Sequence, residues 1–492
     1  MERRKFLKTS AAIGVGAGIV GCEKSPKADV PHPLVSSQTG TGPSVSGECC
    51  RTYASVTDAM QATPETIAYV PCIYTGTGID KPDYLATIDC DSNSKYFGTV
   101  IHRLRMPNVG DELHHFGWNA CSSCHGKADT QRRFIVLPGI TSSRIYIVDT
   151  EDPKAPKIRK TIEPEELFEK ANLSAPHTVH CLADGTIMIS CLGDAKGDGP
   201  GGFLTMNDKF EITGRWENDA TGMKYSYDFW YQPRHNVMVS SEWGAPNTVS
   251  QGFQLEDVEA GKYGQQIHFW DWQERKISQS IDLGEAGMIP LEVRFHHNPD
   301  SVHGFVGAAL SSTMWHWHKQ EDQWSADNVI GVEPVETEGW PFAVPGLITD
   351  LVLSLDDKYL YFSNWLHGDL RQYDVSDPAH PILAGQLWLG GVIGHKSSIP
   401  RQLAGGPQML QLSLDGKRLY VTNSLYSPWD NQFYPDMKKG GGYMMQIDCD
   451  TDQGGMKVNE NFYVDFGAEP DGPARAHEIR FPGGDCTSDI WI

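Results

Sequence analysis

A fourteen-residue segment of the chain places two adjacent histidines close to a Cys-x-x-Cys pair. It reads Asp111-Glu-Leu-His-His-Phe-Gly-Trp-Asn-Ala-Cys-Ser-Ser-Cys124, so it holds His114, His115, Cys121 and Cys124. Imidazole and thiolate are the side chains that bind late first-row transition metals, and thiolates also carry out redox chemistry. The alternative is a disulfide beside two ordinary histidines. The segment alone does not decide between a metal or thiol site and that simpler structure.

Other polar residues recur at one position before a repeated polar turn. His177 lies seven residues before the acid of an Asp-Gly-Thr turn, and Gln408 and Thr349 lie seven residues before the acids of similar turns. The comparable segments elsewhere are Glu112-Leu-His-His115, Tyr227-Asp228, Arg294-Phe-His-His297 and Ala476-His-Glu478. Core packing would place apolar residues at such a position. The pattern therefore predicts a central metal or substrate site.

Histidines dominate this predicted site. The candidate metal ligands are His114, His115, His177, His180 and His477. His297 and His367 are secondary candidates. Strand residues that are one or three positions apart face opposite sides. We therefore expect one histidine of the 114–115 pair and one of the 177–180 pair to bind the metal, while the other orients it or relays protons. Neutral imidazoles without a dominant set of thiolates suit copper, zinc or iron.

Short strands in a repeated pattern would have to position these residues. A polar turn leads to an apolar strand, a loop and a second strand ending in an acid, as in Asp415-Gly-Lys, Arg418-Leu-Tyr-Val421 and Tyr443-Met-Met-Gln-Ile-Asp448. Amphipathic helical stretches are scarce, and residues 163–171 form the clearest one. Seven such units lie at 67–90, 134–148, 187–208, 237–272, 305–316, 359–375 and 419–449. They predict an all-β fold, a single seven-bladed β-propeller with long loop insertions, which residues 462–492 help to close.

The first residues of the chain read as a targeting segment. Arg3-Arg-Lys-Phe-Leu-Lys8 and the small apolar run after it predict a twin-arginine export signal at 1–22. Ile19-Val-Gly-Cys22 resembles a lipoprotein cleavage site, and ordinary cleavage nearby is the alternative. Residues 23–46, rich in Pro, Ser, Gly and Thr, predict a flexible tether before a catalytic domain at 47–492. We expect a periplasmic protein, which a lipid on Cys22 would anchor to the membrane.

The charge of the chain limits its partners. The formal net charge is −22, whereas nucleic-acid binding needs a basic surface. We therefore expect no nucleic-acid partner, and an acidic surface that attracts cations. Neither charge nor length determines the oligomeric state.

Long, nearly unbroken motifs link the chain to one family. They include Lys81-Pro-Asp-Tyr-Leu-Ala-Thr-Ile-Asp89, Tyr227-Asp-Phe-Trp-Tyr-Gln-Pro-Arg-His-Asn236, Ser363-Asn-Trp-Leu-His-Gly-Asp-Leu-Arg-Gln-Tyr373 and Gly483-Gly-Asp-Cys-Thr-Ser-Asp-Ile-Trp-Ile492. From about residue 48 to its end the chain resembles the selenium-binding protein family, whose characterised members include methanethiol oxidases. The resemblance implies copper, and the oxidation of methanethiol with O₂ and water to formaldehyde, hydrogen sulfide and hydrogen peroxide.

The cysteines carry separate expectations. Cys72, in Ala68-Tyr-Val-Pro-Cys-Ile-Tyr74, matches the family cysteine proposed to bind selenium and to matter for activity. The alternative role for Cys72 is that of a buried, inert thiol at the end of an apolar strand. For Cys121 and Cys124 three roles are open. They would bind a soft metal, form a redox disulfide or form a structural disulfide that fixes a loop. With the histidine that follows, they also match a c-type haem attachment signature, a use unknown in the family.

Several functional roles follow as hypotheses. Asp228 and Asp350 are candidate catalytic bases, with Glu478 beside them, and Phe116, Trp118 and Trp365 are candidate walls of a small apolar pocket. The function that we expect is a methanethiol oxidase acting on a small thiol and O₂. A non-catalytic protein that binds selenium or metal is the alternative. A propeller scaffold for protein partners, with a structural metal, is the third.

Overall fold

The computed structural model describes residues 52–127 and 130–492. The described residues all belong to one compact unit, Glu48–Ile492. The predicted export signal, Cys22 and the tether lie outside the described residues. Within that described part, no helix combines the length and the apolar character that crossing a bilayer requires.

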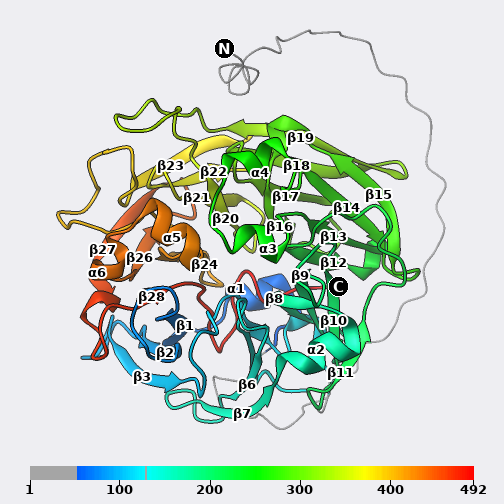
Figure 1. Ribbon diagram of the computed structural model, residues 1–492, viewed down its shortest axis with the longest axis horizontal. Coiled ribbons are helices and arrows are strands. Elements are labelled where there is room, and N and C mark those ends of the chain that lie inside the picture. Colours follow the sequence, from blue (N-terminus) through cyan, green and yellow to red (C-terminus); the bar gives the residue numbers. More distant parts are fainter. Residues whose placement is uncertain (1–51, 128–129) are drawn as a thin grey trace. The chain divides into compact units, whose positions relative to one another are not determined.

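Seven four-stranded antiparallel sheets are arranged as blades in a ring (Figure 1). The predicted seven-bladed β-propeller is confirmed. The innermost strands of blades 1 to 7 are β28 (Arg475–Ala476), β4 (Gly117–Trp118), β8 (Ser174–Cys181), β12 (Phe229–Gln232), β16 (Pro290–Phe295), β20 (Ile348–Leu353) and β24 (Leu410–Leu412). Neighbouring innermost strands contact one another, for example β12 with β16 and β16 with β20.

The other strands follow outward in the same order of blades. The second strands are β1 (Ile67–Ile73), β5 (Phe134–Pro138), β9 (Ile187–Gly193), β13 (Val237–Ser241), β17 (His303–Ala308), β21 (Tyr359–Asn364) and β25 (Arg418–Thr422). The third strands are β2 (Tyr84–Asp89), β6 (Ile145–Asp149), β10 (Gly202–Met206), β14 (Gln266–Asp271), β18 (Thr313–Gln320), β22 (Asp369–Asp374) and β26 (Tyr443–Cys449). The outer strands are β3 (Val100–Arg105), β7 (Lys157–Ile162), β11 (Ile212–Arg215), β15 (Lys276–Asp282), β19 (Gln323–Gly331), β23 (Ile382–Trp388) and β27 (Met456–Asp465).

Helices are few and short. They are α1 (Val56–Met60), α2 (Pro164–Ala171), α3 (Pro246–Val249), α4 (Leu255–Glu259), α5 (Ser427–Phe433) and α6 (Met437–Gly440). The helix predicted for residues 163–171 is therefore confirmed as α2. It begins at a proline, whose missing N–H is not needed in the first turn, and ends at Asn172 in the left-handed conformation, with φ 51°.

The ring closes between the two ends of the described chain. Strand β28 comes from the C-terminal region and pairs with β1, with Cys72 opposite Ala476 and Ile73 opposite Arg475. Blade 1 therefore combines one C-terminal strand with three N-terminal strands. The closure predicted for residues 462–492 is confirmed.

Polar turns between first and second strands hold the blades in register. In blade 7, Ser413 donates a hydrogen bond to Asp415 at 2.7 Å and accepts one from the backbone N–H of Arg418 at 3.0 Å. Gly416 supplies the positive φ of 72° that this turn needs. Blade 6 repeats the turn, with Asp357 at a φ of 58° in place of the glycine. These are the turns that the sequence repeats.

Apolar side chains fill the space between neighbouring blades. One cluster joins Val136, Ile145 and Ile147 of blade 2 to Val179, Ile187 and Leu204 of blade 3. The first and second strands are almost entirely buried, whereas β15 at the edge alternates between exposed and half-buried residues. Since no blade buries both of its faces alone, each blade depends on packing against its neighbours for its stability.

Candidate metal centre

Four imidazoles meet at the centre of the ring, supplied by blades 1, 2 and 3. His114 and His115 precede β4, His177 lies in β8 and His477 follows β28. The ring centroids are 3.8 Å apart for His114 and His477, and 3.9 Å apart for His115 and His177. Potential ligand atoms of His114, His115 and His177 all lie within 4.8 Å of one another, which suits a single metal ion.

Both members of the adjacent histidine pair reach this centre. We expected only one of them to face it, on the premise that the segment is a strand. Instead, Leu113 makes one isolated bridge to Gly139, and β4 begins only at Gly117. The irregular backbone between them lets His114 and His115 point the same way, with ring centroids 5.1 Å apart.

Each imidazole keeps a nitrogen free for a metal. His477 Nδ1 lies 2.6 Å from the carbonyl oxygen of Ser424, and His177 Nδ1 lies 3.0 Å from Thr178 Oγ1. The buried nitrogens without a hydrogen-bond partner are His114 Nδ1, His115 Nε2, His177 Nε2 and His477 Nε2. Buried polar atoms are nearly always paired, and histidine ligands usually have their second nitrogen held by such a partner. The donor set therefore fits a metal ion.

Burial keeps these imidazoles neutral. It lowers the pKa of His477 to about 4 and that of His177 to about 3, and in the second case the negative charge of Asp228 opposes the shift. Burial and the neighbouring histidines also hold the pKa values of His114 and His115 well below the ordinary value. Neutral imidazole is the form that binds metal.

Two buried carboxylates flank His115. Its Nε2 lies 3.8 Å from Glu292 Oε1 and its Nδ1 lies 3.7 Å from Glu478 Oε1. Burial raises the pKa of Glu292 well above its usual range and that of Glu478 to about 8. Arg294 pairs with Glu292 at 2.8 Å, and Arg480 pairs with Glu478. We had not singled out Glu292 or Arg480, because charged residues usually lie at the surface.

Among the described residues, Asp228 and Asp350 contact Arg294 and backbone N–H groups and make no hydrogen bond or ion pair with the four clustered histidines. Asp228 accepts hydrogen bonds from the backbone N–H of Val293 at 2.8 Å and from Arg294 at 2.6 Å. Asp350 accepts one from the backbone N–H of Leu410 at 2.6 Å and lies 3.8 Å from Arg294. Their contacts are those of groups that position Arg294.

A small, mostly apolar cavity touches the cluster at His114. Its volume is about 10 Å³, enough for about one water-sized molecule. The lining residues are His114, Tyr227, Trp243, Ile289, Leu291, Ala309, Leu347, Thr349, Leu425 and Trp429. A small apolar pocket is thus present, but Phe116, Trp118 and Trp365 do not line it, so our prediction of its walls was wrong.

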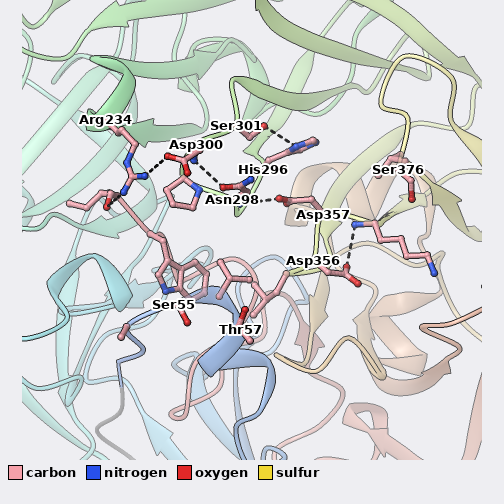
Figure 2. A pocket seen from close by; sticks show the side chains of 18 residues that line it. Ser55, Thr57, Arg234, His296, Asn298, Asp300, Ser301, Asp356, Asp357 and Ser376 are labelled. Atoms are coloured by element: carbon pink, nitrogen blue, oxygen red, sulfur yellow. Dashed lines mark hydrogen bonds and ion pairs between the residues drawn. The ribbon is translucent and has the colours of Figure 1, made fainter. Parts of the chain in front are cut away.

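A larger cavity of about 840 Å³ lies away from this centre (Figure 2). Its walls come from segments that follow the innermost strands, including Arg234 after β12, His296 and Asp300 after β16, and Asp356 after β20. None of the four clustered histidines lines it. Size alone would therefore have pointed to the wrong end of the inner strands.

The remaining histidine candidates lie apart from the cluster. His180 packs edge-to-face against Phe229 and Trp230, with centroids 5.1 and 5.2 Å away. A shift of register between Pro176 and Val179 interrupts the strand alternation that we had assumed for its pair with His177. His297 follows the end of β16, so aligning it with the start of an inner strand was wrong. His367 lies 2.9 Å from the carbonyl oxygen of Val344.

Cys72 lies outside the histidine cluster. It is fully buried in β1, one strand outward from β28, and packs with Tyr74 and Tyr84. Burial raises the pKa of this thiol well above its ordinary value, although a hydrogen bond with Tyr84 opposes the shift. The thiol is therefore protonated at neutral pH.

Cys121 and Cys124 lie near a third thiol. Ser123 Oγ is 3.2 Å from Cys121 Sγ, 3.9 Å from Cys124 Sγ and 3.8 Å from Cys181 Sγ. All three cysteines are free and buried. Cys181 ends β8, and His177 lies near the start of that strand. The thiols and the imidazoles are therefore held at different levels of the ring.

Comparisons with known proteins agree with this geometry. A family model for the 56kDa selenium binding protein (SBP56) matches residues 48–492. A methanethiol oxidase from Xenopus laevis is 56% identical over 468 residues, which cover 91% of this chain and 99% of that protein. Selenium-binding protein 1 from Arabidopsis thaliana is 52% identical, covering 90% of this chain and 96% of that protein.

A solved structure extends the similarity to three dimensions. The crystal structure of a hypothetical selenium-binding protein from Sulfolobus tokodaii superposes with a TM-score of 0.85 at 45% sequence identity. The match covers 89% of this chain and 98% of that one.

Proposed function

The chain belongs to the 56 kDa selenium-binding protein family, and from this premise we propose that it is a methanethiol oxidase that works with copper. Close relatives named methanethiol oxidase match nearly the full chain. The observation that carries the proposal is the cluster of four buried imidazoles, each with an unpaired nitrogen, beside a small apolar cavity. That cavity holds about one water-sized molecule, so methanethiol would enter it only after its walls moved outward.

His114, His115, His177 and His477 would hold the copper ion. Imidazole nitrogens suit copper, zinc and iron; zinc has no redox chemistry, and of the two redox metals we propose copper. When bound, copper would stabilise the thiolate form of the substrate and accept electrons from it. The residues of the chain supply the remaining requirements, which are binding, exclusion of water and control of protons.

The cavity walls bind the methyl group and exclude water. Trp243 and Trp429 lie within 5.6 Å of each other, centroid to centroid, and both line the cavity together with His114. Since the space is about that of one water molecule, methanethiol would already displace these walls, and larger thiols would have to displace them further. The preferred substrate is therefore a short thiol.

Glu292 and Glu478 control the orientation and protons of His115. Each has a carboxylate oxygen within 4 Å of one imidazole nitrogen. Because burial raises the pKa of Glu478 to about 8, its carboxyl group holds a proton at neutral pH. We assign Glu478 as the acceptor and donor of protons at His115 Nδ1, and Asp228 and Asp350 as residues that position Arg294.

The overall reaction balances as methanethiol, O₂ and water giving formaldehyde, hydrogen sulfide and hydrogen peroxide. The test is elemental analysis of the purified protein, with sulfide and peroxide release measured on the same sample after adding methanethiol. We expect about one copper per chain and equal amounts of both products. Bound metal without either product would reject the oxidase.

Binding of selenium or metal without turnover is the second candidate. Relatives named selenium-binding proteins favour it, as does Cys72, which the histidine cluster does not use. A carrier would bind stoichiometrically and consume no O₂. Oxygen uptake in the presence of methanethiol therefore separates the two functions.

We also propose export by the twin-arginine route, with lipid attachment at Cys22, because of the motifs at residues 1–22. Cell fractionation of the full chain and of Arg3→Lys/Arg4→Lys tests the export signal. Metabolic labelling with a radioactive fatty acid tests the anchor, and Cys22→Ala should remove the label.

A further inference from the structure

A second group of histidines lies on blade 5, outside the central cluster. It consists of His296, His303, His316 and His318, to which the proposed oxidase reaction gives no role. Strands β17 and β18 pair with His303 directly opposite His318 and with Phe305 opposite His316. Because residues two apart share one face of a strand, His303, His316 and His318 lie on the same face of the sheet. His296 joins them through its backbone N–H, which donates to the carbonyl of His303 at 3.0 Å.

The imidazoles of this blade 5 cluster form a continuous row. Ring centroids are 5.6 Å apart for His296 and His303, 5.1 Å for His303 and His316, and 5.0 Å for His316 and His318. His303 Nδ1 and His316 Nε2 lie only 2.9 Å apart. Two nitrogens bound to one metal at about 2.0 Å lie roughly 3 Å apart. The pair already has the spacing of two ligands of one ion.

The cluster also contains buried ring nitrogens that have no hydrogen-bond partner. They are His296 Nε2, His316 Nδ1 and His318 Nδ1. His296 Nδ1 is held 3.0 Å from Ser301 Oγ (Figure 2), as an oriented ligand would be. His296 Nε2 and His318 Nδ1 are therefore the flanking nitrogens that make no hydrogen bond, whereas His316 meets His303 through its other nitrogen, Nε2.

We propose that His303 and His316, with His296 and His318 beside them, form a second binding site for a divalent late first-row transition metal ion. The ion takes the place of the proton between His303 Nδ1 and His316 Nε2, that proton moves to the second nitrogen of its own imidazole, which stays neutral, and a flanking imidazole turns to complete the coordination. This proposal does not rest on the proposed oxidase function, since no residue of the central cluster takes part.

Charge and burial around the blade 5 cluster suit a cation. Asp327 lies 3.9 Å from His318, and its side chain is 68% exposed, so it can approach an ion. Burial, with the neighbouring histidines, lowers the pKa of His316 to about 4 and that of His296 to about 3. His316 and His296 are therefore neutral and able to bind at neutral pH. The side chain of His318 is 14% exposed, which leaves a route from solvent.

The site lies beside the larger cavity and away from the central cluster. His296 lines that cavity together with Asn298, Asp300 and Ser301 (Figure 2). The four central histidines are 2% exposed or less. We therefore expect Zn²⁺ to exchange faster at the blade 5 cluster than at the central one.

The test is calorimetric titration of the metal-free full chain with Zn²⁺. We expect two binding events, one for each histidine cluster. His303→Gln/His316→Gln should abolish the blade 5 event and keep the central one, whereas His177→Ala should do the reverse. His395→Gln, which removes an exposed histidine outside both clusters, is the control and should keep both events.

A second variant guards against misfolding of the double substitution. His318→Gln alters a partly exposed side chain and should weaken the blade 5 event at least about tenfold, the loss typical of a disturbed metal site. The melting temperature without metal should stay that of the unmodified chain. Two unchanged Zn²⁺ events in both variants would overturn the proposal and leave the row as a purely hydrogen-bonded structure.

Discussion

At the scale of single residues, the central histidines differ in what holds them. The carbonyl oxygen of Ser424 and the hydroxyl of Thr178 fix one nitrogen of His477 and of His177, respectively. The other nitrogen of each has no partner, so a bound ion would find these imidazoles already oriented. Pre-orientation of this kind strengthens metal binding, because less rotational freedom is lost on binding.

The first prediction compares two buried histidines of one strand. His177→Ala should lower the copper content more than about tenfold, because it removes a donor from the cluster. His180→Ala should keep the copper, since His180 packs against Phe229 and Trp230 instead. Elemental analysis of both variants, with circular dichroism to check folding, measures the difference. Equal loss from both would place His180 among the ligands.

The second prediction concerns thiol reactivity. Burial raises the pKa of Cys72 well above its ordinary value, whereas a hydrogen bond with Cys181 lowers that of Cys124 to about 6. Because the thiolate is the nucleophile, iodoacetamide should modify Cys124 before Cys72 in the folded protein. Peptide mass spectrometry over time measures the order. If Cys72 is modified first, this account of its burial is wrong.

At the scale of elements, contact between strands limits what each position accepts. Gly304 of β17 lies against the ring of Trp317, and an added Cβ would also collide with the carbonyl of Arg294. Trp317 in turn packs edge-to-face on Phe295, with centroids 4.3 Å apart. Blade 5 therefore has no room for a larger residue here.

The third prediction uses that lack of room. Gly304→Ala should destabilise the protein by about 1–3 kcal/mol, the usual penalty for overpacking. Gly331→Ala, at the end of β19 with no atom near the new Cβ, is the matched control and should change stability far less. Urea unfolding of both variants gives the comparison. A control that is destabilised equally would mean that backbone freedom, not collision, sets the effect.

Sequence patterns identified the second and third strands of every blade, and missed most of the first strands. The middle strands are apolar and follow clear polar turns, so their signal is local. The first strands carry buried polar residues, such as His177 in β8 and Glu292 and Arg294 in β16, and charged residues of this kind usually lie at surfaces. For blade 5, the segment taken as comparable, residues 294–297, overlaps the end of β16 and runs past it instead of lying at its start.

The histidine centre was predicted in composition but not in arrangement. Four of the five proposed ligands meet, and His180 lies apart from them. Residues hundreds of positions apart meet there only because the ring closes. The orientation of each ring then depends on single hydrogen bonds, which no pattern of residue types encodes.

At the scale of the whole molecule, buried titratable groups link folding to pH. Burial, with the charge of Arg294, lowers the pKa of His297 to about 4, whereas an unfolded chain has a histidine pKa of about 6.5. The unfolded state therefore takes up this proton first as the pH falls. The neutral histidine contributes stability above about pH 6.5, and this is lost progressively toward pH 4.

The fourth prediction follows from the lowered pKa of His297, which makes the stability of the folded protein fall as the pH falls. Between pH 7.5 and 4.5 the metal-free protein should lose about 2–3 kcal/mol of unfolding free energy through His297 alone. His297→Gln should lack this part of the loss, so the stability difference between the two proteins should change with pH. Urea unfolding at both pH values measures it. A difference that does not vary with pH would mean that His297 is not buried as described.

The join between β28 and β1 also sets an order of events during synthesis. His477 and Glu478 follow β28, near the end of the chain, whereas the blades that carry the other central histidines are made much earlier. A ribosome must release the last strand before that strand can pair with β1. The histidine cluster is therefore completed only in chains that include β28 and His477, and a product terminated before β28 would be unable to assemble it.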